Sequence, residues 1–364
     1  MNLTKYKLGD LIVQRREKNN NYDVPIRGVS KEGFIPAKQK DADTSIYNVF
    51  YKYDFVFNPA RMELNSIALN LEYDKALCSS LYEVFYVKDE SIVLPEFLNL
   101  HIKRDEFARH CDYIGLGSAR EYCRFANIAE FDIELPPIEV QEGIVEADRL
   151  IKKRIRLNNQ MIQHLEATAQ ALYRKIFVDN IDKENLPEGW KMGTLGEIAT
   201  CLDYKRKPLS EDERKPIKGV YPYYGAMSVV DHINQYIFDG TYLLFSEDGA
   251  NVIDENGHPA LQYLWGKFWV NNHAHVLQGN EIVSTEYLYM ALKEVNATHL
   301  VTGAAQPKIN QENMNSIQLV IPSKENMDEF NKNVNLIFSY YKIATEENLK
   351  ITELQSLLLA KMGQ

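Results

Sequence analysis

Apolar residues recur at alternating steps of three and four along residues 139–178. This spacing is typical of a helix that packs along another helix, as in a coiled coil. It therefore predicts one long helix here, ~55 Å in length at ~1.5 Å per residue. We call the apolar positions the first seam, and they are Ile144, Ile151, Ile155, Ile162, Leu165 and Leu172, with Asp148 and Asn158 as polar interruptions.

The same pattern returns near the C-terminus, where Phe330 stands 186 positions after Ile144. This second seam comprises Phe330, Val334, Ile337, Tyr341, Ile351 and Leu358, and Asn348 and Gln355 interrupt it. Shorter motifs also repeat, since Leu8-Gly9-Asp10 corresponds to Leu195-Gly196-Glu197. A tandem duplication is the simplest explanation. The predicted order is a globular domain at 1–138, a long helix at 139–178, a linker at 179–190, a second domain at 191–322 and a second helix at 323–364.

The body of each repeat has the pattern of an α+β domain. Val, Tyr, Phe and Trp at near-alternate positions, bounded by Asn, Asp, Gly and Pro, favour short strands. The clearest runs are residues 49–62 and 80–88 in the first repeat, and 221–233, 236–246 and 262–277 in the second. A helix is then expected from Pro95 to about Cys111, and another from Thr285 to about Leu300. A glycine loop, a strand and a proline precede each long helix.

A solitary amphipathic helix of this length is unstable in water, so each seam needs a partner. Antiparallel pairing of the two long helices would bury both seams and relate the two domains by a pseudo-twofold axis. The alternative, which stays open, is that each helix packs on its own globular domain as part of the core.

Composition places the chain among globular proteins, with 45% hydrophobic and 25% charged residues. No apolar run reaches the ~20 residues that span a bilayer, and the N-terminus lacks the apolar core of a secretory signal. The four cysteines show no zinc-type spacing and are expected to be free thiols. The net charge of −10 argues against a general basic coat for nucleic acid, although local basic patches could still bind it.

Catalytic motifs are weak throughout. There is no dinucleotide-binding glycine motif, phosphate-binding loop, metalloprotease motif or nucleophile elbow. Residues 57–61 share only Asn-Pro with the Asn-Pro-Pro-aromatic motif of amino-methyltransferases. Glu213 and Lys215 have a nuclease-like spacing within a charged run that is better explained as a surface loop. His273 and His275 would point to one face of a strand, but two ligands alone make a weak metal site.

Several segments together resemble the specificity subunits of type I restriction–modification systems. They are LPPIEVQEGIV with LYRKIF, then LPEGWKMGTLGEI, YPYYGAMSVVDHI, YIFDGTYLLFSEDG, NNHAHVL and TGAAQPKI, with VFNPARM and GLGSARE in similar positions of the first repeat. The resemblance covers essentially the whole chain. One departure is that residues 321–326 read IPSKEN, without the second proline and the glutamine usual at the start of the second helix.

The resemblance implies a non-catalytic, cytoplasmic DNA-recognition subunit. It implies two tandem target-recognition domains, separated by two long antiparallel coiled-coil helices, that each read one half of a bipartite, asymmetric site in double-stranded DNA. The helices would fix the gap and dock two modification (methyltransferase) subunits, with restriction (motor and nuclease) subunits where present. No cofactor or metal is expected in this chain, since the modification subunit would hold S-adenosylmethionine. Candidate DNA contacts, chosen by side-chain chemistry, are Lys38, Lys40, Arg61, Ser118, Arg120, Lys205, Arg206, Lys207, Tyr224, Gln306 and Lys308.

Two other classes of function remain as alternatives at this stage. A self-contained methyltransferase or nuclease would bind its cofactor or metal with this chain alone. A structural scaffold would use the long helices to bind proteins and would show no DNA sequence preference.

Overall fold

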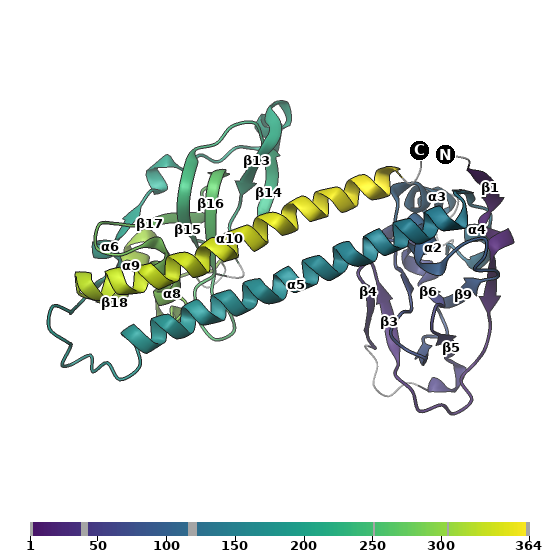
Figure 1. The fold of residues 1–364 in the computed structure, drawn as a ribbon, viewed down its shortest axis with the longest axis horizontal. Coiled ribbons are helices and arrows are strands. Elements are labelled where there is room, and N and C mark those ends of the chain that lie inside the picture. The colour runs from purple at the N-terminus through teal and green to yellow at the C-terminus, as the bar shows by residue number, and fades with distance from the viewer. Residues whose placement is uncertain (1–2, 38–42, 116–121, 250–251, 304–305, 362–364) are drawn as a thin grey trace. The chain divides into compact units, whose positions relative to one another are not determined.

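The computed structural model describes residues 3–37, 43–115, 122–249, 252–303 and 306–361 (Figure 1). The chain divides into two compact units, residues 1–157 with 347–364 (unit 1) and residues 158–346 (unit 2). Each unit combines an α+β body with a part of both long helices, α5 (Ile138–Phe177) and α10 (Lys324–Lys361). The sequence prediction set helices and domains apart, whereas the compact units each include parts of both helices.

Unit 1 is built from short antiparallel strands. Its largest sheet has the order β2-β9-β6-β7, and three further pairs are β1-β10, β3-β4 and β5-β8. The strands are β1 (Thr4–Lys7), β2 (Ile12–Arg15), β3 (Arg27–Ser30), β4 (Gly33–Pro36), β5 (Asn48–Tyr51), β6 (Phe55–Phe57), β7 (Ile67–Leu69), β8 (Lys75–Cys78), β9 (Glu83–Val87) and β10 (Asp132–Leu135). The helical segments are α1 (Leu8–Leu11), η1 (Thr44–Ile46), η2 (Pro59–Leu64), α2 (Pro95–Ile102), α3 (Asp105–Gly115) and α4 (Phe125–Ala129).

The helix expected from Pro95 to Cys111 is in fact two helices, α2 and α3. The side-chain amide of Asn65 donates to the Ile102 carbonyl, and the Lys103 ammonium lies 2.7 Å from the Ile67 carbonyl oxygen. The first contact satisfies a backbone carbonyl at the end of α2, as a helix terminus requires, and the second ties the residue after α2 to β7. The sequence shows no proline or glycine here, so tertiary contacts alone mark the break.

Unit 2 has one large sheet of order β12-β17-β15-β16-β13-β14 and a separate pair, β11-β18. The strands are β11 (Lys191–Thr194), β12 (Ala199–Cys201), β13 (Lys218–Tyr224), β14 (Val229–Ile233), β15 (Phe238–Ser246), β16 (Leu261–Val270), β17 (Ala274–Gly279) and β18 (Gln318–Ile321). The helical segments are α6 (Leu195–Ile198), η3 (Asp203–Lys205), α7 (Glu211–Arg214), η4 (Lys215–Ile217), α8 (Thr285–Leu292), η5 (Thr298–Leu300) and α9 (Gln311–Asn315). The helix expected to reach Leu300 therefore ends at Leu292, and a short turn follows.

The duplication is clearest where each body meets its long helix. In unit 1 β1 pairs antiparallel with β10, and in unit 2 β11 pairs in the same way with β18. The backbone N–H groups of Leu8 and Leu195 donate to the carbonyls of Phe131 and Ile317, both at 2.8 Å. These matching contacts close each body at the strand that leads into its long helix.

The repeated Leu-Gly-Asp/Glu motif has a packing reason. A Cβ atom at Gly9 would lie 3.0 Å from the Cβ of Ala129 in α4, and one at Gly196 would lie 3.2 Å from the Cβ of Asn315 in α9. Glycine is therefore favoured at both positions because two short helices approach closely there.

Within unit 1 the parts of α5 and α10 run antiparallel. Gln355 donates to Asp148 at 2.7 Å, and Arg154 makes two bonds to Glu347 at 2.9 and 2.8 Å. Residue numbers rise along α5 as they fall along α10, which defines the antiparallel direction. The polar interruptions Asp148 and Gln355 thus pair with each other.

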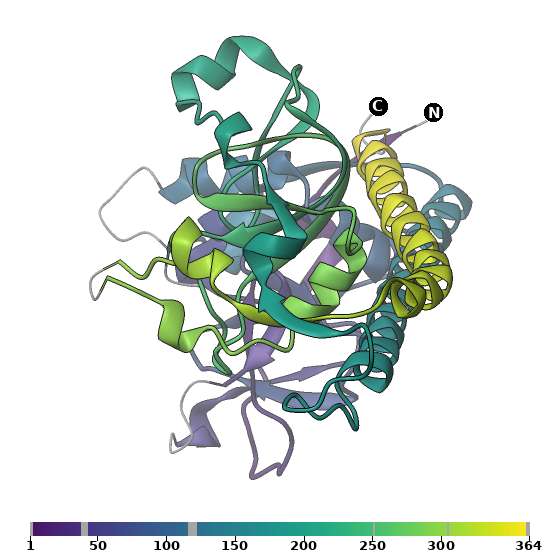
Figure 2. The same cartoon turned by 90° about the vertical axis from the view of Figure 1, so that its left-hand side faces the viewer.

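Within unit 2 the parts of the two helices share one core with the body. The Phe330 ring lies 5.2 Å from that of Phe177 and 6.4 Å from that of Tyr173. The same cluster contains Leu243 of β15 and Tyr287 of α8. Figure 2 shows α10 running alongside α5. The two interpretations left open by the sequence are therefore combined, since the helices both pair and complete the core of the body.

The seam positions of both helices are buried or half-buried throughout the part of the chain that the structure describes. Gln141, outside the predicted seam, is fully buried. It accepts from Leu94 N–H at 3.1 Å and donates to the carbonyls of Ile92 and Pro136 at 2.9 Å. The corresponding residue of the second repeat is Met327, also buried, so an apolar contact replaces this polar anchor. No helix among the described residues is long and apolar enough to cross a membrane.

Replacing Phe330 by Ala should destabilise unit 2 by about 3–5 kcal/mol, because the ring is fully buried between α5 and α8. Urea unfolding followed by tryptophan fluorescence would measure this, since Trp190, Trp265 and Trp269 all belong to unit 2. Leu336→Ala on the same helix is the matched control, as Leu336 is 60% exposed and should change stability by about 0.5 kcal/mol or less. Equal effects of the two substitutions would contradict this account of the core.

Candidate nucleic-acid interface

Unit 1 contains a cleft of about 1080 Å³ between its small sheets. Its charged lining is mainly positive, in contrast to the net charge of −10 for the whole chain. The basic residues are Arg15, Arg16, Lys18, Arg27, Lys31, Arg61 and Arg124, and the acidic residues are Glu32 and Glu83. Polar side chains also line it, among them Asn48, Asn58, Ser79 and Tyr82. A cleft of this kind suits a polyanion that also offers hydrogen-bonding groups.

Some of these cations are already engaged. Arg15 binds Asp54 through two hydrogen bonds of 2.6 and 3.1 Å and lies over the rings of Tyr51 and Tyr86. Burial raises the pKa of Asp54 above its ordinary value, although the hydrogen bond from Arg15 opposes this. Arg124 pairs with Glu83 at 3.2 Å. These residues shape the wall of the cleft.

Three of the exposed cations of the cleft, Arg16, Lys31 and Arg61, differ from Arg15 and Arg124 in their electrostatic partners. Among the described residues, no carboxylate forms an ion pair with Arg16, Lys31 or Arg61. Arg61 belongs to η2, where Pro59 stands in the first turn and Asn58 caps the segment by accepting from Ala60 N–H. Unpaired Lys and Arg side chains are the usual contacts to DNA phosphates, and Arg, Asn and Ser also read base edges.

The DNA contacts predicted in the first repeat differ in where they lie, since one lines the cleft and the others fall outside the described residues. Arg61 lines the cleft. Lys38, Lys40, Ser118 and Arg120 lie outside the described residues. Six further basic residues of the cleft were not among the predicted contacts. Three of them, Arg15, Arg16 and Lys18, form a basic run after the Leu-Gly-Asp motif that was a signal in the sequence. Arg27, Lys31 and Arg124 had no signal in the sequence, because only folding brings them to this cleft.

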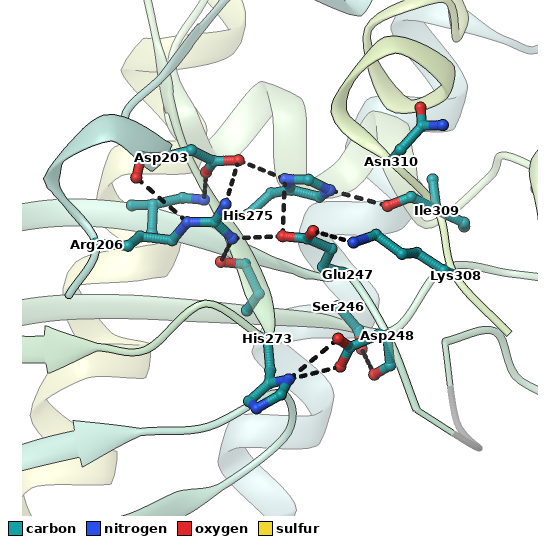
Figure 3. A network of polar contacts seen from close by, with 12 residues as sticks. Asp203, Arg206, Ser246, Glu247, Asp248, His273, His275, Lys308, Ile309 and Asn310 are labelled. Carbon is teal, nitrogen blue, oxygen red and sulfur yellow. Dashed lines mark hydrogen bonds and ion pairs between the residues drawn. The ribbon is translucent and has the colours of Figure 1, made fainter. Parts of the chain in front are cut away.

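In unit 2 a network of polar contacts joins segments far apart in sequence (Figure 3). Arg206 contacts Glu247 at 2.6 Å, Asp203 at 3.0 Å and the Ala274 carbonyl at 2.7 Å. Lys308 reaches the other oxygen of Glu247 at 2.8 Å. His275 lies between Asp203 (Nδ1, 2.5 Å) and the carbonyl of Ile309 (Nε2, 2.9 Å).

The predicted contacts of the second repeat divide into two groups. Lys205, Lys207, Gln306 and Lys308 are exposed, and the network brings their two segments together. Arg206 is only 13% exposed and is compensated by two carboxylates. Tyr224 is half-buried in β13 with its ring against that of Phe268, and burial raises its pKa.

Cys201, Asp203 and His275 approach closely enough to suggest a metal site. Both ring nitrogens of His275 face hydrogen-bond acceptors, a carboxylate and a carbonyl. Both nitrogens are therefore already engaged in hydrogen bonds within the protein, and neither is free to bind a metal ion. Burial also raises the pKa of the Cys201 thiol to about 11, which disfavours the thiolate that metals bind. The group is better explained as a structural ion network.

Two similar α+β units, one with a basic cleft, define a tandem-repeat protein suited to binding nucleic acid. The family model described as type I restriction modification DNA specificity domain matches residues 3–167 and again residues 187–355. The chain therefore belongs to this family and carries its domain twice.

Similar proteins agree with this assignment. A putative type I restriction enzyme specificity subunit of Haemophilus influenzae is 33% identical over 143 residues, which are 38% of this chain but only 35% of that relative. The HindI specificity subunit of the same organism is 22% identical over 363 residues, 75% of this chain and 77% of its own length. The crystal structure of a type I restriction–modification S subunit from M. genitalium has the same fold, with a TM-score of 0.61 at 16% identity over 99% of this chain and 96% of that one.

The network in unit 2 should make folding sensitive to acid. Burial alone would raise the pKa of Asp203 and of Glu247, but hydrogen bonds from His275, and from Lys308 and Arg206, outweigh it and hold both pKa values below their ordinary range. A depressed carboxyl pKa gives stability that is complete above the unfolded pKa, about 4, and is lost as the pH falls through the folded value.

We therefore expect the urea midpoint of unit 2, followed by tryptophan fluorescence, to decline between pH 5 and pH 3. Glu247→Gln should flatten this decline because it removes one of the two titrating groups. Asp212→Asn is the control, since that side chain is 89% exposed, and it should keep the wild-type slope. An unchanged slope in Glu247→Gln would show that the network does not contribute to acid sensitivity.

Proposed function

We propose that this protein is the non-catalytic DNA sequence-specificity subunit of a type I restriction–modification complex. Each α+β body would read one half of a bipartite, asymmetric site in double-stranded DNA. The observation that carries the proposal is the presence of two DNA specificity domains in one chain, one of them with a basic cleft.

The charge distribution supports DNA as the ligand. The cleft collects seven Lys and Arg residues against two Glu in a protein whose overall charge is −10. Phosphate contacts supply affinity without sequence information, whereas amide, hydroxyl and guanidinium groups discriminate between bases. The cleft of unit 1 offers both kinds of group.

We further propose that the long helices fix the gap between the two half-sites and dock two modification subunits. The 40 residues of α5 extend over ~60 Å, which is more than the ~34 Å of one turn of duplex DNA. Each helix also contributes to the core of a body, so a change of helix length would be transmitted to the reading surfaces.

The cofactor belongs to the partner in this proposal. The modification subunits would hold S-adenosylmethionine and transfer the methyl group in the cytoplasm, and restriction subunits would join where they exist. The buried ionisable groups of unit 2 satisfy one another, which supports a structural rather than a catalytic use.

Co-expression with an adenine methyltransferase encoded beside it tests the proposal. The two proteins should co-purify, the complex should methylate a bipartite site, and methylome sequencing of the host should identify that site. Calorimetric titration of this chain alone with S-adenosylmethionine should give no heat. Heat in that titration would favour the self-contained enzyme, and a complex with no sequence preference would favour the structural scaffold.

Charge removal from the cleft gives a sharper prediction. The triple variant Arg16→Ala, Lys31→Ala, Arg61→Ala should weaken DNA binding by the complex at least tenfold, and should reduce the salt slope of binding by roughly 2–3 because each lost phosphate contact removes about one unit. Fluorescence anisotropy with a labelled duplex at several salt concentrations would measure both.

Lys5→Ala provides the matched control. Lys5 lies in the same unit, outside the cleft lining, and its side chain is 84% exposed. Its removal should leave affinity and salt slope within twofold of the wild type. A triple variant with wild-type slope would mean that this cleft does not hold DNA.

A further inference from the structure

The polar network of unit 2 links the two segments that carry most of its predicted DNA contacts. Asp203 and Arg206 flank Tyr204 and Lys205, both exposed, with Tyr204 at 78%. On the other side, Lys308 pairs with Glu247 through its side chain, and through its backbone with Thr302 at 2.8 and 2.9 Å. Figure 3 shows the contacts passing from Asp203 and Arg206 through Glu247 and His275 to Lys308 and Ile309.

Arg206 is held too firmly to act as a contact to DNA. Its guanidinium donates to Glu247 and to the Ala274 carbonyl and pairs with Asp203, all within 3.0 Å. Contact with a phosphate would break bonds to two carboxylates that are themselves only 11% exposed. Buried carboxylates left without a partner are costly, so Arg206 stays in the network.

His275 adds a second connection between the two segments. Its side chain is 1% exposed, and its two ring nitrogens form hydrogen bonds with Asp203 on one side and with the Ile309 carbonyl on the other. Asp203 is fixed further by the Val276 N–H at 2.9 Å, and the Glu247 carbonyl accepts from Ile309 N–H at 2.9 Å. Strand β17 and the residue that follows β15 therefore anchor both segments to the sheet.

We propose that Arg206, with Asp203, Glu247 and His275, is a positioning network for the second DNA-recognition domain. It holds segments 204–207 and 306–308 in the arrangement that reads the bases of one half-site, while exposed Lys205 and Lys207 contact phosphates. The proposal rests on the proposed function and assigns Arg206 a different role from the direct contact expected from the sequence.

The test uses the full chain in complex with its modification subunits. A random-duplex selection with the wild-type complex first supplies the preferred DNA. Affinity is then measured for that duplex and for two duplexes with one or the other half-site scrambled. Discrimination at a half-site is the ratio of the affinity for the preferred duplex to the affinity for the duplex in which that half-site is scrambled. In Arg206→Met this ratio should fall at least tenfold for one half-site. The ratio for the other half-site and the salt slope of binding should stay as in the wild type.

Lys205→Ala is the matched control and should behave in the opposite way. It should lower affinity for all three duplexes alike and reduce the salt slope by about one, with discrimination retained. Tryptophan fluorescence checks that unit 2 is folded in each variant. If Arg206→Met does not fold, the charge-balanced Arg206→Met, Glu247→Gln variant takes its place with the same expectation.

The outcomes separate this proposal from the proposed function. A wild-type complex without any sequence preference would overturn both. A wild-type preference that Arg206→Met leaves intact, or a uniform loss of affinity with a reduced salt slope, would overturn only the positioning role.

Discussion

The structure depends on burying the apolar stripes of two long helices, which would otherwise be exposed to water. Two partners meet this requirement in each unit, the other long helix and the α+β body. Phe330 illustrates both, because its ring contacts Phe177 of α5 and Tyr287 of α8. A helix shared in this way cannot shift without disturbing the body it supports, which suits an element proposed to set a distance.

The elements that join each body to its long helix are alike in the two repeats, whereas the sheets of the two bodies differ. The closing strand pairs, the glycine motif and the long helices match between the repeats. They match because in each repeat the last strand of the body must lead directly into the long helix. Apart from these closing pairs, the sheets of the described residues differ, with a four-stranded sheet and two strand pairs in unit 1 and one six-stranded sheet in unit 2. Such divergence is expected where two domains with one ancestor bind different ligand sequences.

Charge is also handled differently in the two units. The cleft of unit 1 presents exposed cations without carboxylate partners among the described residues. In unit 2, by contrast, Arg206 and Lys308 form ion pairs with Glu247 inside the domain. An arginine next to a lysine in sequence can thus have an unrelated role. Lys205 and Arg206 are neighbours, yet one faces solvent and the other lies in the sheet network.

The sequence by itself determined the repeat, the α+β class and the helix seams, because periodicity and spacing are properties of the chain. It also indicated the polar interruptions, but not that Asp148 and Gln355 would pair with each other. Of the residues that line the cleft, Arg61 was among the predicted contacts, whereas Arg15, Arg16 and Lys18 were not, although they form a basic run in the sequence. Tertiary structure alone decided where α2 ends, that Arg27 and Lys31 join the cleft, and that Arg206 is bound by two carboxylates. Each of these depends on residues distant in sequence, whose approach is set by the packing of the whole unit and leaves no local pattern.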